Sequence, residues 1–79
     1  MYKIRMSPRL STIKPREIVR ALEKAGFYIF RQKGSHLFMK HHDGRWTTIP
    51  MHGKDISRGT LQGILRQSRL TPEQLLELL

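Results

Sequence analysis

Two glycine-containing turn signals constrain the fold of this chain more than any other feature of its sequence. Lys33-Gly34-Ser35 and Asp43-Gly44 divide residues 27–50 into three short runs that are rich in aromatic and β-branched residues. The Asp-Gly pair is a strong signal for a two-residue hairpin turn. We therefore predict a three-stranded antiparallel meander. The strands are expected within FYIFRQ, HLFMKH and RWTTIP.

The two turns also predict the register of the sheet. A two-residue turn at Asp43-Gly44 would pair Phe38 with Ile49, and one at Lys33-Gly34 would pair Ile29 with Phe38. Both faces that result are apolar enough to need cover. Two helices can cover only one of them, and the other would expose an apolar patch, which is typical of a surface that binds a partner. The register puts Phe27, Ile29, Arg31, His36, Phe38, Lys40, Thr47 and Ile49 on one face and Tyr28, Phe30, Leu37, Met39, Trp46 and Thr48 on the other.

Helical patterns lie on both sides of the meander. Residues 14–26 begin with a first-turn proline, repeat apolar residues at helical spacing and stop at Gly26, and residues 58–68 show the same periodicity. Thr71-Pro72-Glu73-Gln74 signals a short last helix over 72–79. The predicted fold is α+β, with the order α-β-β-β-α, a three-stranded antiparallel sheet packed against two helices, and a short C-terminal helix. Double-stranded-RNA-binding domains share this order, which alone says little about function.

The charge of the chain points to a polyanionic partner. Its 79 residues carry 15 Lys and Arg against 6 Asp and Glu, a net charge of +9, and all the basic groups lie within residues 1–70. Such a surface favours nucleic acid first, an anionic membrane second and an acidic protein third. Arg16, Arg20 and Lys24 recur at helical spacing, which suits either a stripe that follows phosphates or an ordinary solvated face.

The size and composition of the chain exclude several classes of protein. A chain this short is one domain with a small core, which we divide into a basic N-terminal arm (1–13) and a folded domain (14–79). Disulfide frameworks, iron–sulfur clusters and thiolate zinc sites are excluded because cysteine is absent. No apolar run has the length of a membrane span or follows a signal-peptide pattern, so we expect a cytoplasmic protein without membrane contact. A fold this small has no room for a deep pocket that holds a large cofactor, so we expect no small-molecule cofactor.

Most of the histidines and carboxylates do not predict a site. His41 and His42 are adjacent on a strand, point to opposite faces and are expected to be solvated. Asp43 serves the turn, which leaves Asp55 as the only acid in the loop that follows the third strand. This pattern argues against paired-carboxylate hydrolysis and against a carboxylate-held magnesium nuclease, and it predicts no metal site.

His36 is the best-placed candidate for catalysis. It opens the second strand directly after Lys33-Gly34-Ser35, where a glycine turn lets a phosphate approach the backbone, and Arg31 is its predicted cross-strand neighbour. RNA supplies its own nucleophile, the 2′-hydroxyl, and a histidine is suited to accept that proton at neutral pH. An ordinary hairpin with an exposed histidine explains the same residues equally well. His52, beside Gly53-Lys54, ranks second.

Four segments of the chain resemble the HicA family of toxin–antitoxin mRNA interferases. They are KPREIVRALEKAGF, RQKGSH, DGRWTTIPMHGKDISRGTLQGILRQ and LTPEQLLELL, which together extend from Lys14 to Leu79. The most specific pieces are Gly34-Ser35-His36, the Pro50 and His52 pair, and Gly59-Thr60-Leu61 before Ile64-Leu65.

The resemblance implies a small toxin with a fold like that of double-stranded-RNA-binding domains. Such a toxin cleaves mRNA without a metal, using the histidine that matches His36, and a HicB-type antitoxin covers its active surface. Two alternatives stay open: a module that binds RNA without cleaving it, and a protein that only binds an acidic partner. The residues expected to contact phosphate are Arg31, Lys33, Gly34, Ser35, His52, Lys54, Arg16, Arg20 and Lys24.

Overall fold

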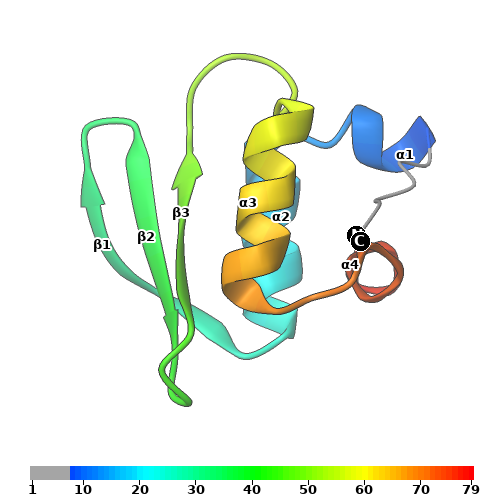
Figure 1. Ribbon diagram of the computed structural model, residues 1–79. Helices are drawn as coiled ribbons and strands as arrows, with labels where there is room; N and C mark the ends of the chain where they lie inside the picture. Colours follow the sequence, from blue (N-terminus) through cyan, green and yellow to red (C-terminus); the bar gives the residue numbers. More distant parts are fainter. Residues whose placement is uncertain (1–7) are drawn as a thin grey trace.

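The computed structural model describes residues 8–79, in which all the helices lie on one side of a three-stranded sheet (Figure 1). The strands are antiparallel and neighbour each other in the order β1-β2-β3. The predicted α+β class and α-β-β-β-α order are confirmed, with one short helix added before them. The elements are α1 (Pro8–Ser11), α2 (Pro15–Lys24), β1 (Phe27–Lys33), β2 (His36–His41), β3 (Trp46–Pro50), α3 (Arg58–Ser68) and α4 (Pro72–Leu78).

The helices begin where the sequence signals place them. Ser57 precedes α3, and its hydroxyl oxygen accepts a hydrogen bond from the Thr60 N–H (3.3 Å). The predicted capping box of α4 is confirmed, because Thr71 Oγ1 accepts from the Gln74 N–H (3.1 Å) while Gln74 Oε1 accepts from the Thr71 N–H (2.9 Å). None of the helices within residues 8–79 is both long and apolar enough to cross a membrane.

The hydrophobic core lies between the sheet and the helices. α2 and α3 each turn one apolar face toward the strands, which is why their apolar residues recur at helical spacing. Every buried polar side-chain atom of the described residues has a hydrogen-bond partner. The largest fully buried apolar side chains are Leu10, Ile13, Ile18, Leu22, Met39, Ile49, Leu61 and Leu75.

Residues 8–13 are not the extended arm that the sequence suggested. Leu10 of α1 and Ile13, which follows this helix, are completely buried, and the Ile13 carbonyl accepts a hydrogen bond from the Ile56 N–H (2.8 Å). Arg9 forms an ion pair with Glu17 of α2. This segment therefore belongs to the core, whereas the remainder of the predicted arm lies outside the described residues.

The predicted register between β2 and β3 is wrong by one residue. The His41 N–H donates to the Arg45 carbonyl (2.8 Å) and the Gly44 N–H donates to the His41 carbonyl (2.9 Å), so the loop has three residues and not two. Gly44 has φ +99°, the left-handed conformation that closes a three-residue hairpin loop. Met39 consequently lies opposite Thr47, and not Lys40.

The predicted register between β1 and β2 is also wrong. Gly34-Ser35 forms the turn, with Gly34 at φ +58°, so Lys33 and not Arg31 lies opposite His36. A bulge at Phe30 then shifts the pairing back by one residue, so that Ile29 lies opposite Met39 and not opposite the predicted Phe38.

Together the two corrections divide the sheet into a covered face and an open face. Leu37, Met39, Thr47 and Ile49 are buried against the helices, although the prediction divided them between two faces. The expectation that one face stays uncovered and carries apolar side chains is confirmed. On this open face lie Tyr28, Phe30, Arg31, Lys33, His36, Phe38, Lys40, Trp46, Thr48 and Pro50.

Candidate functional site

His36 lies at the end of the sheet where the β1–β2 turn meets the loop that follows β3 (Figure 1). It is the first residue of β2, and because Leu37 next to it is buried, its side chain belongs to the open face, where it is exposed. The Met51 N–H donates a hydrogen bond to the Ser35 carbonyl (2.6 Å), which ties the turn to the loop. The His36 side chain is therefore exposed to solvent, while its backbone is fixed between β1 on one side and the end of β3 on the other.

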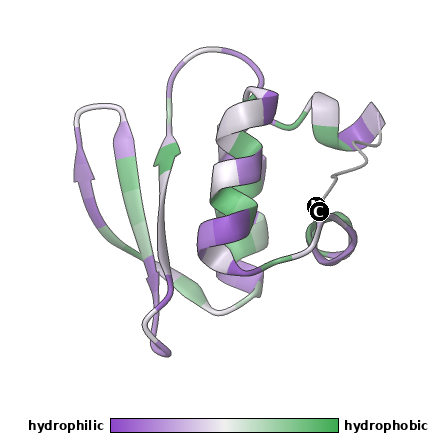
Figure 2. Cartoon of the chain, viewed as in Figure 1, coloured by the Kyte–Doolittle hydropathy of each residue, from purple (hydrophilic) through white to green (hydrophobic). Residues whose placement is uncertain are grey.

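Cationic side chains share the open face with His36. Lys33 lies directly opposite it on β1, and Arg31, opposite Phe38, has its guanidinium carbon 5.9 Å from the Phe38 ring centroid. The end of β1 is accordingly a hydrophilic stretch (Figure 2). None of the strand residues is Asp or Glu. Because no carboxylate belongs to the sheet, this end of the open face suits a negatively charged ligand.

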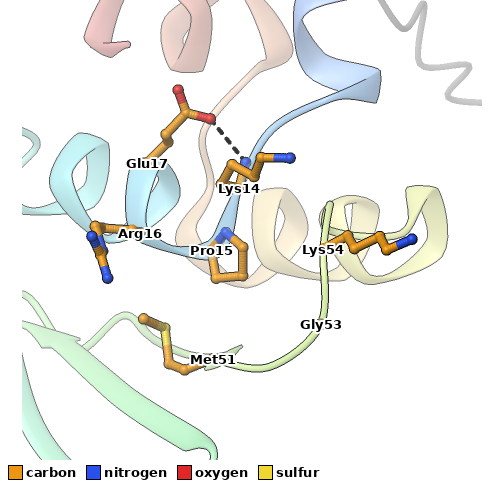
Figure 3. Close-up of a pocket in the computed structure, with 7 residues that line it drawn as sticks. All are labelled: Lys14, Pro15, Arg16, Glu17, Met51, Gly53 and Lys54. Atoms are coloured by element: carbon orange, nitrogen blue, oxygen red, sulfur yellow. Dashed lines mark hydrogen bonds between the residues drawn. The ribbon is translucent and has the colours of Figure 1, made fainter.

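A shallow hollow of about 370 Å³ lies between the start of α2 and the loop after β3 (Figure 3). Arg16 and Lys54 stand on opposite sides of it, and no carboxylate of residues 8–79 pairs with either side chain. Lys14 Nζ, in contrast, is 2.6 Å from Asp55 Oδ1. The hollow therefore adds, at the same end of the domain, two cations that pair with no carboxylate among the described residues.

Glu17 is the one acid in this hollow, and its charge is already engaged. The Arg9 guanidinium and the Lys14 N–H both donate hydrogen bonds to its carboxylate. These bonds, the one from Arg9 first, lower the pKa of Glu17 below its usual value. Glu17 thus stays ionised and serves the α1–α2 junction.

The sequence-predicted contact residues fall into two groups. The larger group lies at one end of the domain, on the last part of β1, the turn, the first residue of β2, the loop after β3 and the start of α2: Arg31, Lys33, Gly34, Ser35, His36, His52, Lys54 and Arg16. Arg20 lies one turn further along α2, where it is exposed. Lys24 ends α2, and its Nζ donates to the Leu78 carbonyl of α4 (3.1 Å), so the structure does not bring it to His36.

Beyond His36 the open face becomes aromatic, and whereas the predicted register already put Phe30 and Trp46 on one face, it placed Phe38 and Lys40 on the other. Phe30, Phe38, Lys40 and Trp46, with Gly44, line a hollow of about 470 Å³. Lys40 Nζ lies 4.3 Å from the Phe30 ring centroid. We call Phe30, Phe38, Lys40 and Trp46 the aromatic surface. A three-residue reading of the Asp-Gly loop was the signal that would have grouped Phe38 with Trp46.

A second polar cluster lies at the opposite end of the sheet and is built into the structure. The His41 side chain is only 11% exposed, packs edge-on against Phe27 (5.1 Å between centroids) and has Nδ1 3.0 Å from Asp43 Oδ1. Arg45 Nε donates to Asp43 Oδ2 (2.9 Å), and Arg45 Nη1 donates to the Ser68 carbonyl at the end of α3 (2.6 Å). The expectation that His41 is solvated is therefore wrong, because Phe27 and the turn enclose it.

The carboxylate of this second cluster is held in its charged form. The pKa of Asp43 is lowered, first by the hydrogen bond from the Arg45 backbone N–H and then by the Arg45 guanidinium.

Within residues 8–79 no three His, Cys, Asp or Glu side chains come together in a way that would hold a metal ion.

Comparison with known protein families gives one finding. Residues 15–70, well over half of the chain, match the family model described as the HicA toxin of bacterial toxin–antitoxin systems. The matched region runs from the start of α2 to just past the end of α3, so it includes the whole sheet, His36 and the loop after β3. No curated protein matches the chain.

Proposed function

The chain belongs to the HicA toxin family of bacterial toxin–antitoxin systems, and from this premise we propose that it is an endoribonuclease that cleaves mRNA. In this proposal it is the toxin of a type II system and acts in the cytoplasm, where mRNA is found. His36 is its general acid/base, no metal ion takes part, and a HicB-type antitoxin neutralises it.

The observation that carries the proposal is the setting of His36. Its side chain is exposed on the open face, and within residues 8–79 no carboxylate pairs with it. Lys33 lies opposite on the neighbouring strand, and Gly34 in the adjacent turn has no atom within 4 Å of the place where a Cβ would stand. A phosphodiester can therefore approach the histidine between cations and an open stretch of backbone.

The chemistry needs few groups because RNA brings the nucleophile. The 2′-oxygen attacks the adjacent phosphorus, a 2′,3′-cyclic phosphate forms, and the bond from phosphorus to the next 5′-oxygen breaks. His36 accepts the 2′-proton, and water or a neighbouring cationic side chain supplies a proton to the leaving 5′-oxygen. Arg31 and Lys33 stabilise the charge that builds on the non-bridging oxygens.

The remaining cations serve to hold the RNA on either side of the cleaved bond. Arg16 and Lys54 line the hollow beside the loop, and His52 belongs to the same loop. They are placed to bind phosphates that flank the reacting one. Arg20 would contact a more distant phosphate, and Lys24, which bonds to the end of α4, would contribute least.

The proposal is tested by replacing His36 in the full chain. His36→Ala should lower the rate of RNA cleavage by about 100- to 10,000-fold, the usual contribution of a general acid or base, while thermal unfolding stays unchanged. His52→Ala is the matched control, because it removes a histidine from the same end and should mainly weaken RNA binding. Cleavage by the wild type should persist in EDTA and yield 2′,3′-cyclic phosphate ends. Full cleavage by His36→Ala, or loss of cleavage in EDTA, would contradict the mechanism.

The exposed aromatic surface favours one further candidate function, an RNA-binding module without catalysis. In that case RNA binds tightly, affinity falls steeply as the salt concentration rises, and no products form over long incubation. The same cleavage assay therefore separates the two functions.

A further inference from the structure

We propose that the open face of the sheet is a platform on which single-stranded RNA lies, with bases stacked on the aromatic surface and the strand led along β2 to His36. This inference rests on the proposed function and extends it from the reacting phosphate to the recognition of the substrate.

The alignment along β2 is the first observation that carries it. His36, Phe38 and Lys40 alternate on one strand and so project from the same face, roughly 7 Å apart in succession. Trp46 lies opposite Lys40 on β3, and Thr48 lies opposite Phe38. The histidine and the aromatic side chains thus form one continuous surface, with His36 at one end and Trp46 at the other.

The exposure of the aromatic rings is the second observation. Phe30 is 55% exposed and Trp46 is 53% exposed, although large aromatic side chains normally bury most of their surface. The pocket between them is open to solvent and includes Gly44, where no side chain occupies the space. Half-exposed flat rings around a hollow are suited to receive other flat rings.

The cations on this face are the third observation. Lys40 lies over the Phe30 ring and Arg31 lies near the Phe38 ring, so each cation accompanies an aromatic side chain. Alternation of cations and aromatic rings is how proteins bind single strands, because the rings stack on bases while the cations follow the phosphates. No strand residue is acidic, so nothing on the sheet itself opposes a polyanion.

Single-stranded RNA fits these observations better than a duplex. In a duplex the flat faces of the bases are already stacked on each other, and proteins bind it through its backbone and minor groove. Exposed rings such as Trp46 and Phe30 gain nothing from such a ligand. A protein partner would also use exposed aromatic side chains, and the experiment below includes that outcome.

Trp46 provides the probe, because it is the only tryptophan of the chain. Full-length His36→Ala protein is titrated with an unstructured oligoribonucleotide, and Trp46 fluorescence is followed beside the anisotropy of labelled RNA. Stacking should quench the fluorescence in step with binding and protect Trp46 from acrylamide. A duplex of the same length should quench much less. RNA binding that leaves Trp46 fluorescence unchanged would overturn the proposal.

Substitutions then test the surface itself. Trp46→Ala and Phe30→Ala should each weaken binding of the single strand by roughly 5- to 150-fold, the usual range for losing one stacking ring, and Trp46→Phe should retain most of the affinity. Ile29→Ala is the matched control: Ile29 is 50% exposed but lies opposite the buried Met39, on the other face, and its loss should leave affinity unchanged. Thermal unfolding of each variant verifies the fold.

Two outcomes distinguish an RNA-binding platform from a protein-binding surface and from a failure of the proposed function. If Trp46→Ala keeps its RNA affinity but loses its affinity for the purified antitoxin, the surface binds protein and the inference is overturned. If His36→Ala still cleaves RNA, the proposed function fails. The quenching titration, repeated with a 2′-O-methyl oligonucleotide that has no free 2′-hydroxyl, still tests the platform.

Discussion

The two ends of the sheet contain the same kinds of residue and use them in opposite ways. Each end has a turn with a left-handed glycine, a histidine and nearby cations. At the hairpin end, His41 and Arg45 gather around Asp43, and Arg45 also bonds the Ser68 carbonyl. At the other end, His36 faces solvent with cations beside it and no carboxylate paired with it among residues 8–79.

Asp43 decides which end of the sheet is structural. Asp43 lies within the β2–β3 loop, where its carboxylate accepts from Arg45 and its N–H donates to His41 Nδ1 (3.2 Å), so the histidine and the arginine become parts of the fold. The Gly34-Ser35 turn contains no acid, and its cations keep their capacity to bind a ligand. Both ends have a histidine and cations next to a glycine turn. Only the hairpin end has a carboxylate, that of Asp43, in the turn itself.

Replacing His36 and His41 by alanine should produce the largest difference between the two ends of the sheet. His36→Ala should lower cleavage by about 100- to 10,000-fold and change the free energy of unfolding by less than about 0.5 kcal/mol, because its side chain is exposed. His41→Ala should do the reverse, costing about 1 kcal/mol through the lost contact with Phe27 while cleavage by the folded protein is retained. Urea unfolding and an RNA cleavage assay on both variants measure this. Equal losses of cleavage in two folded variants would remove the distinction between the ends.

Replacing Arg45 and Lys33 by alanine should produce the next largest difference, in the free energy of unfolding and in RNA binding. Arg45→Ala should cost about 2 kcal/mol of unfolding free energy, since it removes the guanidinium bonds to Asp43 and to the Ser68 carbonyl, and with them a cation 5.1 Å from the Phe27 ring centroid. Lys33→Ala should cost less than about 0.5 kcal/mol and instead weaken RNA binding. Urea titrations and RNA binding curves check both, and an Arg45→Ala variant as stable as the wild type would be the contrary result.

Gly34 and Gly26 should differ in how much stability an alanine costs at each position. Gly34→Ala should cost about 1 kcal/mol, the usual penalty of a left-handed alanine, because no atom lies near its Cβ position. Gly26→Ala should cost about 1 kcal/mol more, because its φ is +99° and its Cβ would lie 2.8 Å from His41 Nε2.

The extra cost at Gly26 has its own control. In the double variant Gly26→Ala/His41→Ala the clash is removed, so the two effects on unfolding should not add, and the cycle should return a coupling of about 1 kcal/mol. Additive effects would show that His41 does not restrict this position.

Acid should weaken the hairpin end, with the smallest effect of the four. The native pKa of Asp43 is lowered, so its contribution to stability is present above the unfolded pKa, near pH 4, and is lost as the pH falls through the lower native pKa. The urea concentration at which half of the wild type is unfolded should therefore decrease as the pH is lowered below about 4, and Asp43→Asn should make this decrease smaller. His36→Ala should leave it intact. An unchanged acid dependence in Asp43→Asn would contradict the role given to this carboxylate.

Features that depend on a few neighbouring residues were predictable from the sequence. The start of α4 follows from Thr71 and Gln74, which bond to each other's backbone within one turn. His36 was singled out because it directly follows a glycine turn with two nearby cations, and the structure keeps these residues at one end. Its chemical role is still a prediction.

The sheet register could not be predicted, because Asp43-Gly44 is compatible with both a two-residue and a three-residue loop. A slip of one residue exchanges the faces of a strand. The choice is made by packing: the observed loop buries Thr47 and Ile49 beside Leu37 and Met39, whereas the predicted one would have separated them. Phe38 and Lys40 of the aromatic surface were assigned to the wrong face for the same reason.

The sequence by itself determined the order of the elements, the position of the turns, the excess of positive charge and His36 as the leading candidate. Each depends on spacing or composition within a short stretch of chain, where local hydrogen bonds and side-chain periodicity act. Only the tertiary structure decided which sheet face is open, that residues 8–13 join the core, and that His41 is enclosed while His36 is not. These outcomes depend on contacts between residues far apart in the chain, since burial is settled by what packs against a surface.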